Sequence, residues 1–197
     1  IRDSFAAGEG KKPIKDLPSL SKRLNSAIEY SILQKVDIIH LSAGWPKSYM
    51  SRQLEATIKK AQKLGIQFVT ASGNSSQRSM VYPCQLEDVL CVGALRPNGD
   101  VARFSNWGGQ VDVYAPGEKI LSTIPTKLPP LYSSRMGYDY KNGTSQAAPI
   151  VTASMAYLMS IFPNEKADTI RARILKSAKS IKEGRGIKGL IQIDKAE

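Results

Sequence analysis

A serine at the predicted start of an apolar helix is the first residue of this sequence that could do chemistry. Ser145 stands in the stretch Asn142–Pro149, and the apolar residues that follow predict a helix to about Phe162. The first backbone N–H groups of a helix have no partner inside it, so they stabilise negative charge on a nearby oxygen. Pro149 is compatible with the first turn but would break the helix further along. Taken alone, this stretch would favour the simpler interpretation that Thr144 or Ser145 is a helix cap.

Asn74 is the second candidate, just beyond a predicted strand. It follows the apolar run Ile66–Ala71 and the pair Ser72–Gly73. An amide N–H at a strand end could stabilise the oxyanion that forms during acyl transfer. The alternative interpretation is a turn residue, because Asn, Ser and Gly are common in turns.

Alternating helices and strands must position these two residues. Helical spacing of apolar residues predicts helices over residues 16–33, 54–64 with a stop at Gly65, 143–162 and 167–178. Apolar runs predict strands over residues 36–41, 66–71 and 89–94, shorter strands over 101–104, 111–115 and 119–123, and a last strand over 189–193. Strands separated by helices of this length are typical of an α/β fold with a mostly parallel sheet.

Residues 143–149, G-T-S-Q-A-A-P, followed by I-V-T-A-S-M-A, resemble the serine motif of the subtilisin-like serine proteases, the subtilase family. Further matches follow the family's order over nearly the whole chain, in residues 36–44, 65–74, 82–83, 89–94, 104–108, 112–117 and 189–193. The resemblance implies a three-layer α/β/α fold, hydrolysis of peptide bonds through an acyl-enzyme, and a cis peptide at Tyr82–Pro83.

The resemblance also assigns roles to residues. Ser145 would be the nucleophile, and Asn74 would donate its side-chain amide to the oxyanion together with the backbone N–H of Ser145. Two segments would line the pocket for the residue before the scissile bond, and an extended peptide would add as a strand between them. These segments are Ser42, Ala43 and Gly44, and Ala71, Ser72 and Gly73. Ala43 replaces a larger apolar residue of many relatives, which would alter the shape of the pocket.

The other two members of the family's catalytic triad are missing from this sequence. Subtilases carry an aspartate in D-T/S-G and a histidine in H-G-T ahead of the serine, and neither motif is present. The one histidine, His40, lies in an apolar strand without a following Gly-Thr, so we interpret it as structural. A serine without a histidine base is a weak nucleophile.

We therefore expect residues 1–197 to be the C-terminal part of a single peptidase domain that lacks its N-terminal strands and has no internal boundary. A tightly bound N-terminal fragment, upstream or on a separate chain, would supply the aspartate and histidine, and a propeptide is a further expected partner. The expected function is a serine endopeptidase acting on peptides or proteins. The alternative is a catalytically degenerate subtilase that binds peptides or proteins.

Charge and composition limit which other classes of partner we expect. The net charge of +11 comes from basic residues scattered over predicted helices with no interleaved aromatic residues, so we do not expect nucleic-acid binding. No apolar run approaches the roughly 18 residues that cross a bilayer. Acidic residues do not cluster as metal ligands, so no cofactor or metal site is identifiable, and calcium is allowed by family habit alone.

The two cysteines leave the compartment open. Cys84 and Cys91 could pair across a short connection, or both could be buried thiols. The family resemblance implies a secreted or periplasmic protein, although this segment shows no secretion signal.

Overall fold

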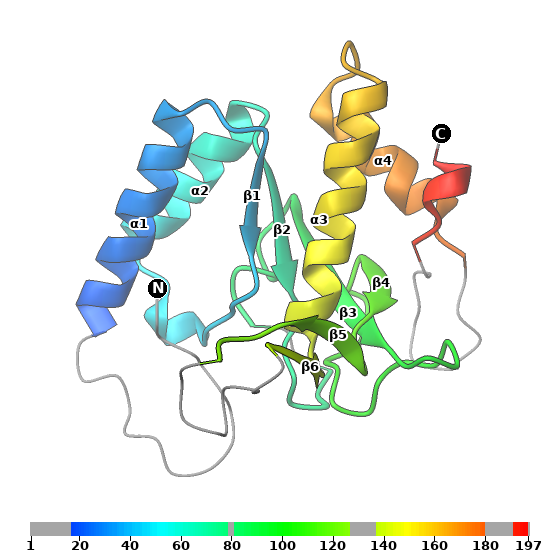
Figure 1. Ribbon diagram of the computed structural model, residues 1–197. Helices are drawn as coiled ribbons and strands as arrows, with labels where there is room; N and C mark the ends of the chain where they lie inside the picture. Colours follow the sequence, from blue (N-terminus) through cyan, green and yellow to red (C-terminus); the bar gives the residue numbers. More distant parts are fainter. Residues whose placement is uncertain (1–16, 79–80, 127–136, 180–190, 197) are drawn as a thin grey trace.

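The framework of the computed structural model, which describes residues 17–78, 81–126, 137–179 and 191–196, is a four-stranded parallel sheet (Figure 1). Its strands lie in the order β1 (Ile38–Leu41), β2 (Gln67–Ala71), β3 (Val89–Leu95) and β4 (Val113–Pro116). Every residue of β2 and β3 is buried, as expected for a parallel sheet that is covered on both faces.

Helices cover both faces of this sheet. The helices are α1 (Leu17–Leu33), α2 (Arg52–Lys63), α3 (Thr144–Ile161) and α4 (Ala167–Ser177). Phe68 packs in a core with α1 and α2, whereas the next residue, Val69, packs in a second core with α3 and α4. Successive side chains of a strand point to opposite faces, so α1 and α2 form one outer layer and α3 and α4 the other. The predicted α/β architecture with a mostly parallel sheet is confirmed.

The helix ends follow local signals. The Ser51 side chain caps α2 by accepting a hydrogen bond from the N–H of Leu54 at 3.1 Å. The same helix ends at Lys63, and Gly65 follows with φ +86°, a conformation that favours glycine. A short 3₁₀ helix, η1 (Lys47–Tyr49), lies between β1 and α2.

Three expectations for strands were wrong or incomplete. Of residues 101–104 only Val101 forms a single bridge, to Leu95, because β4 takes the place beside β3. The expected strand over 189–193 is replaced, in its described part, by a backbone bond from Ile191 to Tyr114 and a 3₁₀ helix, η3 (Ile193–Lys195); residues 189 and 190 lie outside the described residues. The strand near residue 120 leaves the main sheet and pairs with an unforeseen partner, as β5 (Ile120–Thr123) and β6 (Tyr138–Lys141).

Strand β1 lies at the edge of the main sheet, where it pairs with β2 and, among the described residues, with no other strand. The carboxyl ends of β1 and β2 meet the start of α3 at one end of the sheet, as hydrogen bonds from Ser145 to Ser42 and from Thr144 to Asn74 show. This edge strand and this junction carry the candidate site.

Two local features resolve earlier alternatives. Cys84 and Cys91 form a disulfide, so the first of the two interpretations is confirmed. The peptide bond between Tyr82 and Pro83 is cis, as the family resemblance implied. In the parts of the chain that the structure describes, every helix is too short or too polar to span a bilayer.

Candidate active site

Ser145 lies in the first turn of α3, where the predicted helix begins. Its half-buried hydroxyl donates a hydrogen bond to the backbone carbonyl of Ser42 at 3.2 Å, beyond the end of β1. In the described residues, no acceptor bonds the backbone N–H of Ser145. The serine therefore stands beside a free helix N–H, as its position in the sequence predicted.

Asn74 is held across from this turn by Thr144. The Asn74 Oδ1 atom accepts hydrogen bonds from the backbone N–H and the hydroxyl of Thr144, both at 2.9 Å. The Thr144 hydroxyl in turn accepts the N–H of Gly73 at 3.2 Å. Since a backbone N–H can only donate, the oxygen of the Asn74 amide must face Thr144, and the Nδ2 atom faces the other way. Within the described part of the chain, Nδ2 has no acceptor.

The two free donors flank the space above Gly143. A Cβ atom added to Gly143 would lie 3.4 Å from Asn74 Nδ2 and 3.6 Å from the backbone nitrogen of Ser145. Gln146 Oε1 lies 2.6 Å from the same point, so a substrate oxygen could enter only if the Gln146 side chain moved aside. An oxygen that then lay closer to both nitrogens than this point could accept from both, which is the arrangement that stabilises the oxyanion of acyl transfer.

The first predicted pocket segment, Ser42 to Gly44, continues from β1. The Thr70 hydroxyl lies 3.0 Å and 3.1 Å from the carbonyl oxygens of Leu41 and Ala43 and fixes the course of the chain there. Gly44 makes no backbone hydrogen bond to any other described residue. This segment therefore keeps backbone groups that an extended peptide could use.

The second predicted pocket segment, Ala71 to Gly73, differs because its backbone groups already have hydrogen-bond partners. The Ser72 N–H donates to Val92 at 2.9 Å, and the Ser72 carbonyl accepts from the Asn106 side chain at 3.0 Å. The Gly73 carbonyl accepts from the Asn106 N–H at 2.9 Å. A peptide strand paired to both segments is thus a wrong expectation, because the backbone of the second segment is already bonded. Ser72 and Gly73 can contribute a wall only.

His40 contacts both α3 and the first predicted pocket segment. Its Nδ1 atom is 2.8 Å from Thr152 Oγ1 on α3, and its Nε2 atom is 2.7 Å from Ser42 Oγ. Among the described residues no hydrogen bond joins His40 to Ser145, so His40 is not placed as its base. Sequence reasoning missed the contacts with Thr152 and Ser42, although strand alternation puts His40 on the same sheet face as α3.

Burial lowers the pKa of His40 from its ordinary value of 6.5. The unfolded chain therefore takes up a proton at a higher pH than the folded one. The stability that this group contributes is present above about pH 6.5 and is lost as the pH falls through the folded pKa.

We therefore expect the urea midpoint of the wild type to fall more than that of His40→Gln between about pH 7.5 and about pH 5.5. The variant is the control for all other titrating groups, because it removes the single histidine of this chain. Equal decreases would contradict the prediction.

No group of three or more His, Cys, Asp or Glu side chains within the described ranges could hold a metal ion. Calcium therefore stays a prediction.

Comparisons with known proteins point to one family. Residues 15–190 match the family model described as the subtilase family, Peptidase_S8. Subtilisin DY of Bacillus licheniformis is 34% identical over 176 residues, which are 87% of this chain and 60% of that protein. The major intracellular serine protease of Bacillus subtilis (strain 168) is 35% identical over 68% of this chain and 40% of that protein. The chain thus spans about half the length of these relatives.

Solved structures are also similar. The prenylagaramide maturation protease PagA has a TM-score of 0.77 and 28% identity, over 97% of this chain and 70% of that one. The PatG macrocyclase domain has a TM-score of 0.74 and 31% identity, over 89% of this chain and 55% of that one.

Proposed function

The chain belongs to the subtilase family, and from that premise we propose that Ser145 is the nucleophile of a serine endopeptidase. The Ser145 oxygen attacks the carbonyl carbon of a peptide bond and loses its proton to a histidine base. The tetrahedral oxyanion accepts hydrogen bonds from Asn74 Nδ2 and the Ser145 N–H. The C–N bond breaks as the histidine protonates the amine, which leaves an acyl-enzyme. Water then hydrolyses the ester and regenerates Ser145.

The pair of free N–H donors at Gly143 is the observation that carries this proposal. A cap or a turn residue would use its polar atoms within the protein, whereas Asn74 uses its oxygen and leaves both Nδ2 hydrogens without a described acceptor. The Ser145 N–H is free in the same space, at the first turn of a helix. An oxyanion satisfies both donors at once, and a neutral ligand would gain less from them.

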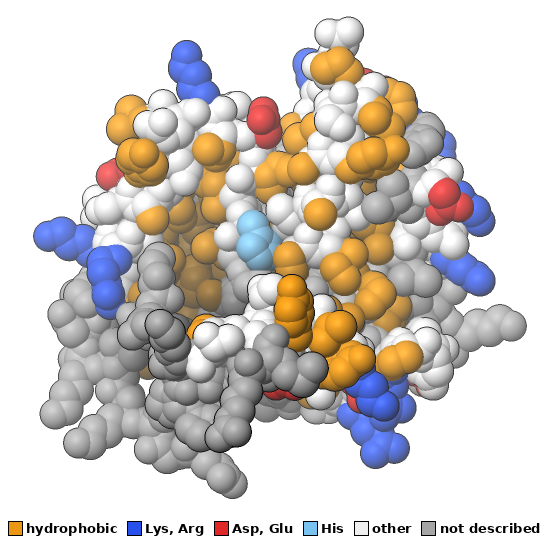
Figure 2. All heavy atoms as spheres, viewed as in Figure 1, with side chains coloured by type: hydrophobic (Ala, Val, Ile, Leu, Met, Phe, Trp, Pro, Cys, Tyr) orange, Lys and Arg blue, Asp and Glu red, His pale blue; other side chains and the backbone are white. Residues whose placement is uncertain are grey.

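We propose that the aspartate and histidine come from a further segment, upstream in the same polypeptide or on a separate chain, which docks against β1. The free edge of β1 offers unpaired backbone groups to another strand. Figure 2 shows a hollow lined by hydrophobic side chains beside the pale-blue histidine. An added strand there would bury this apolar surface and bring a base to Ser145.

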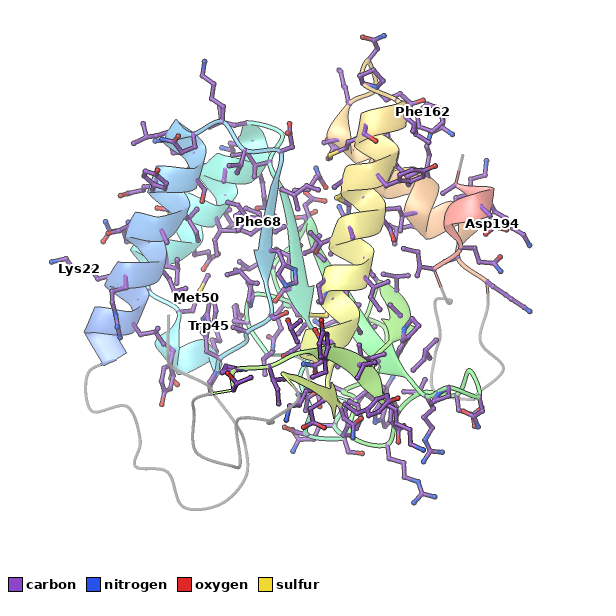
Figure 3. The ribbon with its side chains drawn as sticks, in the orientation of Figure 1. Lys22, Trp45, Met50, Phe68, Phe162 and Asp194 are labelled. Carbon is purple, nitrogen blue, oxygen red and sulfur yellow. A yellow bond between two sulfur atoms is a disulfide. The ribbon has the colours of Figure 1, made fainter. Side chains whose placement is uncertain are left out.

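Trp45 belongs to the core on the α1 side of the sheet. Its side chain is 1% exposed and lies with Met50 and Phe68 between α1 and the sheet (Figure 3). The indole Nε1 atom is buried and has no hydrogen-bond partner in the described part of the chain. A buried donor without a partner costs about 1–3 kcal/mol.

The substrate class that fits is an extended peptide or protein segment. Its backbone would pair with Gly44, and its side chain would lie between Ala43 and the wall formed by Ala71, Ser72 and Gly73. A propeptide that occupies the same groove stays a prediction.

Labelling with a fluorophosphonate tests the proposed function. We expect the probe to modify Ser145 in the complete protease and to modify the 197-residue chain far more slowly, because an alcohol without a base is a weak nucleophile. The measurement is the second-order labelling rate, with the modified residue located by peptide mass spectrometry. No labelling in the complete protease would favour the alternative, a degenerate subtilase that binds peptides without cleaving them.

We further propose that the protein is exported. The Cys84–Cys91 disulfide is typical of an oxidising compartment. The names of relatives do not decide this point, since one of them is an intracellular protease. Thiol titration of the denatured protein, isolated from its native host under alkylating conditions, is expected to find neither cysteine free. Two free thiols would contradict export.

A further inference from the structure

Pro149 leaves one carbonyl of the active-site helix without its usual donor. In an α-helix the carbonyl of Ser145 would accept the N–H of residue 149, but a proline has none. The Ser42 hydroxyl donates to this carbonyl instead, at 2.8 Å. The hydrogen bond from Ser42 therefore replaces a missing helical bond at the residue that carries the nucleophile.

This replacement hydrogen bond fixes which ring nitrogen of His40 carries a proton. A serine hydroxyl has a single proton, and Ser42 gives it to the Ser145 carbonyl. The contact of 2.7 Å between Ser42 Oγ and His40 Nε2 must then be donated by the imidazole. His40 therefore carries a proton on Nε2.

The other ring nitrogen, Nδ1, faces a hydroxyl that can donate a hydrogen bond to it. The Thr152 hydroxyl lies 2.8 Å from His40 Nδ1 and, as placed, donates its proton to the Ala148 carbonyl at 3.0 Å. The Ala148 carbonyl already accepts the N–H of Thr152 within α3, so the threonine proton is free to turn toward Nδ1. A neutral imidazole with its proton on Nε2 thus satisfies every group of the network, whereas the opposite tautomer would leave Ser42 facing an acceptor without a proton to share.

The surroundings favour a neutral ring. Strand β2 and helix α3 carry no Asp, Glu, Lys, Arg or further His, the one ionisable side chain of α3 is the exposed Tyr157, and the nearest carboxylate along β1 is Asp37, just before the strand.

We propose that His40 is a positioning residue for Ser145, acting through Ser42 as a neutral imidazole protonated on Nε2. It orients the Ser42 hydroxyl, which fixes the Ser145 carbonyl and with it the first turn of α3. That turn carries both the Ser145 N–H and the Ser145 hydroxyl, so a loosened carbonyl would displace the nucleophile and one oxyanion donor together. The inference rests on the proposed function of the same site.

The tautomer is the first test. In ¹⁵N-histidine-labelled complete protease, the His40 signals are assigned by their loss in His40→Gln. We expect a protonated Nε2 and an unprotonated Nδ1 at neutral pH. The Nδ1–H tautomer, or a fast exchange of both tautomers, would overturn the inference. This measurement requires no catalysis, so it stays informative even if Ser145 proves unreactive.

Matched variants give the second test, read as kcat and KM for a peptide substrate. His40→Gln places an amide N–H near the position of Nε2 and should keep kcat within about twofold, whereas His40→Asn reaches only toward Thr152 and should lower kcat about tenfold, the scale of one hydrogen bond. Ser42→Ala should lower kcat by a similar factor with little change in KM. The double variant of His40→Asn and Ser42→Ala should be no slower than Ser42→Ala alone, because His40 acts through Ser42.

Equal kcat values for the Gln and Asn variants, or additive losses in the double variant, would overturn the inference while the proposed function stands. A wild-type protease that neither cleaves peptides nor reacts with the fluorophosphonate would overturn the proposed function instead.

Discussion

Replacing Ser145 by alanine is expected to lower kcat of the complete protease by about 10⁶-fold, the loss measured for the corresponding change in subtilisin, a member of this family. The hydroxyl is the atom that forms the acyl-enzyme in the proposed mechanism, and it belongs to the residue whose own N–H is one of the two oxyanion donors. The measurement is the hydrolysis of a chromogenic peptide under single-turnover conditions, which reports the chemical step.

Ser160→Ala is the matched control, because Ser160 is an exposed serine near the far end of the same helix. We expect its kcat to equal that of the wild type. A Ser145→Ala variant that retained more than about a hundredth of the activity would exclude Ser145 as the nucleophile, because oxyanion stabilisation and binding alone leave only about 10³–10⁴ over the uncatalysed reaction.

Replacing Asn74 by leucine should lower kcat by about 10²–10³-fold, or about 2.7–4 kcal/mol, with little change in KM. That magnitude was also measured in this family. Leucine fills a similar volume and removes the amide, so the variant tests the donor rather than the space. The change should fall on kcat because Nδ2 bonds an oxygen whose negative charge develops only in the transition state.

Two further variants separate the donor from its support. Thr144→Val removes the hydroxyl that bonds Asn74 Oδ1 but keeps the Thr144 backbone bond, so we expect a smaller loss than for Asn74→Leu. Gly143→Ala would put a methyl group 2.6 Å from Gln146 Oε1 at a backbone φ of +156°, so it should lower kcat by straining the turn that carries Ser145 although both N–H groups remain. Equal kcat values for Asn74→Leu and the wild type would exclude an oxyanion role for Asn74.

The main elements of the fold could be predicted from local patterns. The helix stop at Gly65, the apolar runs of β2 and β3 and the long helix after Gly143 each depend on residues that are near neighbours in the sequence. Where the prediction failed, the outcome depended on competition between distant segments. Residues 101–104 have strand-like composition, but β4 pairs with β3 in their place, and local propensity carries no information on that choice.

The candidate site divides in the same way. The sequence by itself determined which groups could do the chemistry, a serine hydroxyl at a helix start and an asparagine amide after a strand, because both signals are local. Only the tertiary structure decided how these groups are held: Thr144 turns the Asn74 amide, and Ser42 replaces the donor that Pro149 lacks. The physical reason is that the hydrogen bonds of Thr144 to Asn74 and of Ser42 to Ser145 join residues 70 and 103 positions apart, and such contacts leave no periodic trace along the chain.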